Sequence, residues 1–161
     1  MKRIIPLICW LTFALALFSS GCVAPQPYLA VTPSGKPEMV INAPVGKIKA
    51  AIIGDMVNNG YAGVEQDTEY MLRFSRPVDG KEAFGAALST GNAYSTNKRV
   101  VTFTFVPTAD GVRVIVSNAW TAQMPGGQTN TTELNSGEIF NYYYMTLQSI
   151  KAGLEKHTEA K

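Results

Sequence analysis

The segment from residue 99 to residue 120 constrains the fold most, because large apolar side chains recur at every second position on both sides of Asp110-Gly111. Successive side chains of a strand point to opposite faces, so this period gives each arm one strongly apolar face. The residues on that face are Val101, Phe103, Phe105, Val112, Val114 and Val116. An Asp-Gly pair between two such runs is a strong turn signal. The sequence therefore predicts a β-hairpin with one buried face.

Shorter segments on either side predict three more strands and two helices. The strands cover residues 39–41, 61–64 and 70–76, with a turn between the last two at residues 66–68. Helical spacing of apolar residues predicts one helix over 45–57 and another over 139–154. We expect the helix termini to involve the following residues: Asn42 as the first N-cap, Gly60 after the first helix, and Asn135 with Glu138 as a capping pair.

Two segments, 81–98 and 121–135, are small, polar and glycine-bearing, and they predict long connections, with one short helix over 81–88. The resulting order is β-α-β-β-β-β-α. The connections between strands are too short for parallel crossovers, which need a dozen or more residues. We therefore expect an α+β domain with a mostly antiparallel sheet of about five strands and two helices packed on one face.

One flank of the first predicted helix carries only small residues, because Gly46, Ala50 and Gly54 recur at every fourth position. Each glycine costs up to about 1 kcal/mol relative to alanine in a helix interior, so the flank needs a reason. One interpretation is a docking site for a helix of a partner. The other, which we favour, is close packing of this flank on the sheet of the same domain.

The N-terminal segment has the pattern of a secretory signal. Lys2 and Arg3 precede an uncharged, mainly apolar stretch over residues 4–18, and small residues lead to Cys22. At about 15 residues the apolar stretch is shorter than the roughly 20 that span a bilayer as a helix. Residues 17–22, Leu-Phe-Ser-Ser-Gly-Cys, resemble the lipobox of bacterial lipoproteins, although Ser19 stands where that family usually has leucine. The alternative is an ordinary secretory peptide with an incidental cysteine.

The lipobox resemblance implies cleavage by signal peptidase II between Gly21 and Cys22 and attachment of a diacylglyceryl group and palmitate to Cys22. In that family an aspartate after the cysteine retains the protein in the inner membrane. Val23 and Ala24 stand here instead, which implies the periplasmic face of the outer membrane. The predicted organisation is a signal peptide over 1–21, a proline-rich tether over 22–37, one domain over 38–157 and a tail over 158–161.

Charge and cysteine content exclude several classes of function. The chain has a formal net charge of +2, and the mature form without Lys2 and Arg3 is near neutral, which excludes a basic stripe for nucleic acid. Of the two cysteines, Cys9 lies in the predicted signal peptide and Cys22 receives the lipid. The mature domain therefore has no disulfide and no cysteine nucleophile, and its core alone must stabilise it.

The sequence does not predict an enzyme, a cofactor or a metal site. The only histidine, His157, follows the last apolar residue of the final helix, and a solvated tail is the preferred interpretation. Glu65, Asp67 and Glu69 alternate and would share one face of a strand, where three carboxylates can bind Ca²⁺. We favour a solvated turn, because the spacing lacks the complete calcium-loop pattern.

Two functions from different classes remain. The first is a non-catalytic module that binds or scaffolds another component of the envelope. The alternative is a carrier of a small apolar ligand or lipid in a cavity between helix and sheet. The element order resembles the helix-grip domains of lipoprotein subunits in outer-membrane assembly machines, and also small uncharacterised envelope lipoproteins. The candidate contact residues for a partner or ligand are Tyr94, Trp120, Tyr142 and Tyr144.

Overall fold

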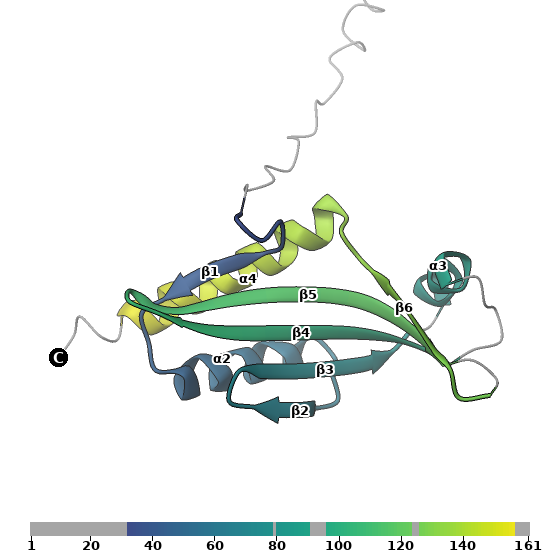
Figure 1. Cartoon of the computed structure of the whole chain (residues 1–161), viewed down its shortest axis with the longest axis horizontal. Helices are drawn as coiled ribbons and strands as arrows, with labels where there is room; N and C mark the ends of the chain where they lie inside the picture. The colour runs from purple at the N-terminus through teal and green to yellow at the C-terminus, as the bar shows by residue number, and fades with distance from the viewer. Residues whose placement is uncertain (1–31, 79, 91–95, 124–125, 157–161) are drawn as a thin grey trace, which may run out of the picture.

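The hairpin predicted around Asp110-Gly111 forms the centre of the sheet. β4 (Thr96–Thr108) pairs along its whole length with β5 (Gly111–Gln123), in the register that places Phe103 opposite Val116. The structure is a computed structural model, and it describes residues 32–78, 80–90, 96–123 and 126–156 (Figure 1).

Four shorter strands complete an antiparallel sheet of six strands. They are β1 (Glu38–Ile41), β2 (Val64–Thr68), β3 (Met71–Pro77) and β6 (Thr129–Glu133). The order is β1-β5-β4-β3-β2, and β6 pairs with the end of β5 that β1 leaves free. The predicted α+β class with an antiparallel sheet is confirmed, with six strands instead of about five.

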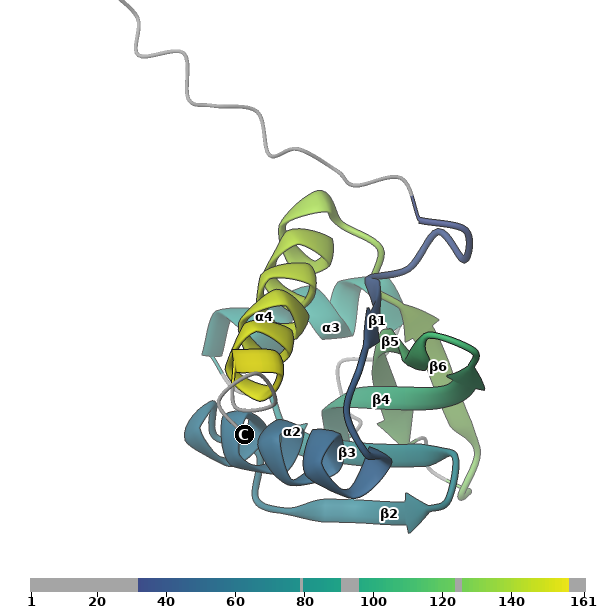
Figure 2. The ribbon, with the colours of Figure 1, turned by 90° about the vertical axis from the view of Figure 1, so that its left-hand side faces the viewer.

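Three helices lie on the same side of the sheet in the described part of the chain (Figure 2). They are α2 (Val45–Asn58), α3 (Gly80–Thr90) and α4 (Gly137–Lys156). α2 and α4 cover the half of the sheet nearest the β4–β5 turn, while α3 contacts the opposite end of β4 and β5 (Figure 1). We call the face under the helices the inner face and the other the outer face. The two predicted long helices and the short helix over 81–88 are present.

Apolar side chains from the helices and strands form a core on the inner face. The strands contribute alternate residues, as the hairpin pattern predicts, and α2 contributes Ile48, Ile52 and Met56. Three edge-to-face contacts connect four aromatic rings in a chain: Tyr61, Phe74, Phe103 and Tyr143. Such contacts stabilise the core beyond the area that they bury.

The helix termini differ in part from the prediction. α2 begins after Pro44, without a side-chain cap. Asn42 lies two residues too early to be the N-cap, and its N–H donates to Glu155 of α4. At the start of α4, Ser136 rather than Asn135 accepts the N–H of Ile139, at 3.4 Å. The predicted end of α2 is confirmed. Gly60 has a φ of +81°, and the N–H of Tyr61 reaches back to the carbonyl of Met56, as in a Schellman motif.

The small-residue flank of α2 does not pack on the sheet, so the favoured interpretation was wrong. Gly46, Ala50 and Gly54 are all exposed, and a Cβ built on either glycine would have no neighbour within 4 Å. The reason is the helical period, because Ile48 and Ile52 occupy the inner side of the helix and hold the small flank toward solvent.

The acidic residues of β2 do not share a face. Glu65 follows the inner-face Val64 and lies on the outer face, and a register shift between Val64 and Gln66 then interrupts the alternation. Asp67 pairs with Leu72 on the inner face, where it contacts Lys49 of α2 at 2.6 Å. The turn comes after them, at Glu69, and not at residues 66–68. The bulge therefore separates carboxylates that strict alternation would have placed side by side.

The predicted loop over 121–135 contains the end of β5 and the whole of β6. Its threonines are polar, but they are β-branched and suit an edge strand. Gly126 and Gly127, with φ values of +100° and +85°, lie in the connection between the strands. Residues 32–37, placed in the tether by sequence, form a turn against the domain, in which Pro37 is buried and accepts the N–H of Val116.

Candidate functional site

Three inner-face residues form a row across neighbouring strands at the end of the sheet that α3 contacts. Arg76 of β3 lies opposite Arg99 of β4, and Arg99 lies opposite Trp120 of β5. Each lies on the inner face because it stands two residues away from a buried inner-face residue of its own strand. These buried residues are Phe74, Val101 and Asn118, respectively. Like charges directly opposite on neighbouring strands destabilise a sheet. The two arginines therefore require an acidic partner.

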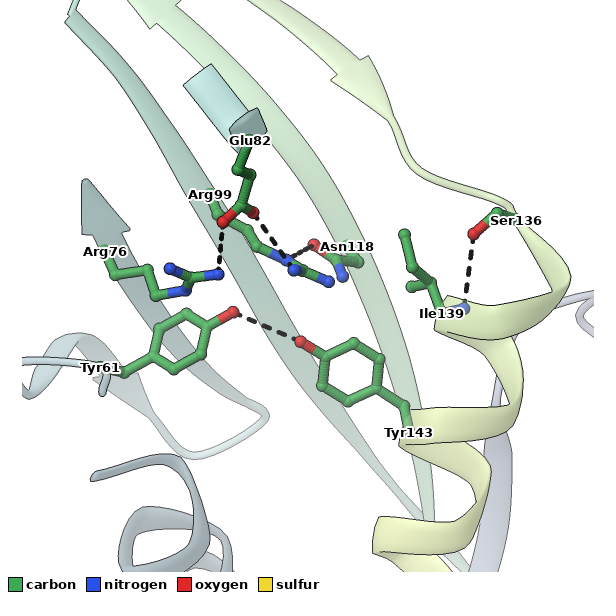
Figure 3. Close-up of polar contacts among 8 residues, drawn as sticks. All are labelled: Tyr61, Arg76, Glu82, Arg99, Asn118, Ser136, Ile139 and Tyr143. Atoms are coloured by element: carbon green, nitrogen blue, oxygen red, sulfur yellow. Dashed lines mark hydrogen bonds and ion pairs between the residues drawn. The ribbon is translucent and has the colours of Figure 1, made fainter. Parts of the chain in front are cut away.

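Glu82 of α3 is that partner, and each of its oxygens accepts from a different arginine (Figure 3). Arg76 Nη2 lies 2.6 Å from Oε2, and Arg99 Nη1 lies 3.2 Å from Oε1. The three side chains are only about a fifth to a quarter exposed, at 25%, 19% and 23%. One carboxylate shared by two guanidinium groups leaves this cluster with an excess positive charge.

Tyrosines form the wall of the site on the side of α2 and α4. The hydroxyls of Tyr61 and Tyr143 are 3.4 Å apart, and the Arg76 guanidinium lies 5.6 Å from the centre of the Tyr61 ring (Figure 3). Burial raises the pKa of Tyr143, so this hydroxyl stays protonated. Burial opposes the charge on Arg76, but interactions with Tyr61 and Glu82 outweigh it and raise the pKa of the guanidinium.

These side chains border a hollow on the inner face, next to α4. It has a volume of about 230 Å³, and we call it the arginine–tyrosine hollow. Its lining residues are Asn59, Tyr61, Arg76, Arg99, Tyr142 and Tyr143. They come from the segment that follows α2, from β3 and β4, and from α4. The site therefore depends on segments far apart in the sequence.

Two buried N–H groups next to Arg99 have no acceptor in the part of the chain that the structure describes. Asn118 is 6% exposed, and its Oδ1 accepts from Arg99 Nε at 3.4 Å. Its Nδ2 and the Nε1 of Trp120 are buried without a partner. Unsatisfied buried donors are rare and costly in native proteins. The surroundings of Arg99 thus contain more donors than acceptors.

α3 contacts the sheet through small residues and Glu82. A Cβ built on Gly85 would lie 3.3 Å from Cη2 of Trp120, and Ala86 is fully buried. On the opposite side of the helix, Phe84 and Leu88 are 69% and 70% exposed. The shared carboxylate of Glu82 is therefore a principal polar link between α3 and the sheet.

The structure places the four predicted contact residues in different environments. Trp120 is half-buried beneath α3, and Tyr142 is exposed, lines the hollow and makes an edge-to-face contact with Tyr143 at 5.0 Å. Tyr144 is half-buried, stacks on Phe140 and lies outside the hollow. Tyr94 lies outside the described residues, as do Gly21, Cys22 and His157.

Sequence reasoning missed Arg76, Arg99 and Glu82. The sequence did contain a signal for the two arginines. Each stands an even number of residues from the apolar residues of its strand and is therefore directed to the same, inner face. The position of Glu82 had no such signal, since nothing in the sequence places α3 over β4.

The outer face has a second cluster of charged side chains, around Glu65, that resembles the cluster around Glu82 in composition. Arg73 and Lys98 lie 3.7 and 3.8 Å from Glu65, so this cluster also combines two cations with one carboxylate. Its side chains are 39% to 49% exposed, about twice as much as those around Glu82. Exposed ion pairs of this kind contribute little to stability.

Comparison with protein-family models, with curated proteins and with solved structures finds no match to this chain. Among the described residues, no helix is both long and apolar enough to cross a membrane. Those residues also contain no group of three or more histidine, cysteine, aspartate or glutamate side chains arranged to hold a metal ion. The donors around the arginine–tyrosine hollow suit recognition of an acceptor, and their arrangement is the main chemical feature of the inner face.

Proposed function

We propose that this protein is a lipid-anchored, non-catalytic binding module of the bacterial envelope. The anchor is the lipid on Cys22, in a segment that resembles a lipobox, and the residues after it favour the periplasmic face of the outer membrane. A lipid anchor of more than one acyl chain holds a protein stably at a bilayer. The domain then presents its binding surface to another component of the envelope.

The arginine–tyrosine hollow is the observation that supports a binding role. It brings Arg76 and Arg99 beside Tyr142, which is 44% exposed and accessible from solvent. Arginine and tyrosine dominate the energetics of many interfaces, because each combines a large contact area with directional hydrogen bonds. The packing of Tyr61 and Tyr143 fixes the tyrosine wall of the hollow in advance, which reduces the entropy lost on binding.

The packing of the core favours this role over that of a carrier with an internal cavity. The interface between α2, α4 and the sheet is filled by the core residues, including Leu147 at 0% exposure. A narrow space beside Phe140 and Tyr143 has a volume of about 30 Å³. That volume holds roughly one or two water molecules. A carrier of apolar ligands would have to separate the helices from the sheet.

Photo-crosslinking in intact cells tests the proposal. A photoreactive amino acid replaces Tyr142 in one variant and Tyr70 in a control, because Tyr70 is also exposed, at 54%, but lies on the β2–β3 turn. We expect a discrete crosslinked product from position 142, and its loss when Cys22 is replaced by serine. Equal crosslinking at both positions, or none at position 142, would contradict a binding role for this surface.

A further inference from the structure

We propose that the arginine–tyrosine hollow binds an oxyanion, the carboxylate or phosphate of a small ligand, through Arg76 and Arg99, beside which the N–H groups of Asn118 and Trp120 lie buried. This inference rests on the proposed binding function and specifies its chemistry. The cluster around Glu82 has more hydrogen-bond donors than acceptors. Each guanidinium presents several N–H donors and no acceptor, and within the described ranges Glu82 is the only carboxylate that the two arginines share.

The buried amides extend this excess of donors. Asn118 Nδ2 and Trp120 Nε1 belong to successive inner-face residues of β5, and Trp120 lies opposite Arg99. Neither donates to an acceptor in the described residues. A buried donor without an acceptor costs free energy, so the surroundings of Arg99 have an excess of donors that an added acceptor would reduce. An oxygen-rich group therefore fits the composition of this site.

The charge of the cluster around Glu82 favours an anion over a cation or a neutral apolar ligand. The two arginines and Glu82 leave one excess positive charge, in a site where the side chains are mostly buried. Hydrogen bonds from a guanidinium to a carboxylate or phosphate are shorter and stronger than neutral ones, and their fork geometry favours planar or tetrahedral oxyanions. The protonated Tyr143 adds no negative charge that would oppose the ligand.

The dimensions of the site restrict the ligand to a small charged group with an extension toward solvent. The hollow has a volume of about 230 Å³. Tyr142 lines both this hollow and a shallow neighbouring depression bordered by Asp55, Glu138 and Met145, of which Met145 is 62% exposed. The charged end of a ligand would contact the arginines, while the remainder would lie over Tyr142 and Met145.

Glu82 then acts as an internal competitor. Its two oxygens already accept from Arg76 and Arg99, so an incoming oxyanion uses the remaining donors or displaces this carboxylate. Glu82→Gln removes the competing charge and should tighten oxyanion binding on the order of tenfold, the effect of one charge-assisted contact. A structural role of the bridge alone predicts no such gain.

Tryptophan fluorescence provides a direct readout. The mature lipoprotein, which begins at Cys22 and is kept in detergent, contains Trp120 as its only tryptophan, because Trp10 lies in the predicted signal peptide. Sodium phosphate and glycerol 3-phosphate are titrated against sodium chloride at equal ionic strength, and thermal melts are recorded in parallel. We expect a saturable change in fluorescence and a higher Tm with the oxyanions only. Short-chain phosphatidylglycerol, compared with phosphatidylcholine, tests whether the oxyanion belongs to a lipid headgroup.

Single substitutions of arginine test which side chains produce the saturable fluorescence change. Arg99→Gln should abolish the saturable change, and Arg99→Lys, which keeps the charge but loses the fork, should weaken it roughly tenfold. Arg73→Gln in the cluster around Glu65 is the matched control on the outer face and should leave it intact. Circular dichroism verifies that each variant is folded. If an arginine variant does not fold, Arg76→Lys is tested in its place.

Three results would overturn the inference: no difference between phosphate and chloride, loss of the effect in Arg73→Gln, or weaker binding by Glu82→Gln. In each case crosslinking through position 142 would still report on the proposed binding role. Tighter binding of short-chain phosphatidylglycerol than of glycerol 3-phosphate would support a lipid headgroup as the source of the oxyanion. Equal binding of the two would support a free oxyanion ligand.

Discussion

Arg76 and Arg99 lie directly opposite each other on β3 and β4, and each donates to a different oxygen of Glu82. The arrangement holds two like charges in adjacent positions of the sheet through one residue of a helix. It also connects α3 to the sheet at the edge of the arginine–tyrosine hollow. The same contact therefore contributes to stability and to the electrostatic character of the site.

Glu82→Gln should lower the free energy of unfolding by about 1–3 kcal/mol, because it leaves two opposed, partly buried guanidinium groups without a carboxylate. Urea denaturation followed by circular dichroism measures the change. Glu65→Gln is the control, since it also removes a carboxylate shared by two cations, but from an exposed cluster worth at most about 1 kcal/mol. Equal losses in the two variants would mean that the bridge to α3 has no special role.

Gly111→Ala should destabilise the protein strongly. Gly111 has a φ of +136°, and a Cβ there would lie 2.5 Å from the carbonyl oxygen of Ile41 in β1. Gly60→Ala is the matched control, because Gly60 has a φ of +81° but no atom within 4 Å of the added Cβ. We expect about 1–2 kcal/mol for the backbone conformation alone and a larger loss at Gly111. Thermal melts that rank Gly60→Ala as the more damaging change would contradict the close approach of β1.

Gly54→Ala should stabilise the protein by up to about 1 kcal/mol. Gly54 lies in the interior of α2, is exposed, and has no neighbour near an added Cβ. Alanine then improves helix propensity without a steric cost. Ala50→Gly on the same flank provides the reverse test and should lose a similar amount. A destabilised Gly54→Ala protein would show that this flank is covered.

Stability should fall at acidic pH in part through Glu38. Arg113 Nη2 lies 2.8 and 2.7 Å from its two carboxylate oxygens. Burial opposes the charge on Glu38, but Arg113 outweighs it and lowers the pKa below the ordinary 4.5. A lowered folded-state pKa contributes stability above pH 4.5, which is lost as the pH falls through the folded value.

The measurement for Glu38 is the free energy of unfolding as a function of pH. Glu38→Gln should be less stable at neutral pH, by about 1.5–3 kcal/mol, and should lose less stability below pH 4.5 than the parent protein. Parallel pH profiles of stability for the two proteins would contradict a contribution of Glu38 to the loss of stability at acidic pH.

Cys22→Ser should abolish lipidation and leave either a soluble periplasmic product or an uncleaved precursor. The expectation follows from the resemblance of residues 17–22 to a lipobox. Cell fractionation with mass spectrometry of the product measures both outcomes. A mature Cys22→Ser protein that still fractionates with the membrane would contradict lipid anchoring at this residue.

The sequence by itself determined the elements whose period repeats over many residues. Val101, Phe103 and Phe105 fixed the buried face of β4, because alternation assigns a face to each side chain of a strand. Ile48, Ile52 and Met56 fixed the inner side of α2 in the same way. These patterns are local, and burial of one face is enough to select them.

Only the tertiary structure decided the features that depend on neighbours. β6 forms because the end of β5 offers free hydrogen-bonding groups, and the bulge between Val64 and Gln66 places Glu65 and Asp67 on opposite faces. The candidate site joins Arg99 of β4 to Glu82 of α3 and Tyr143 of α4. No local period relates such residues, since their proximity results from the sheet register and from the packing of helices on its inner face.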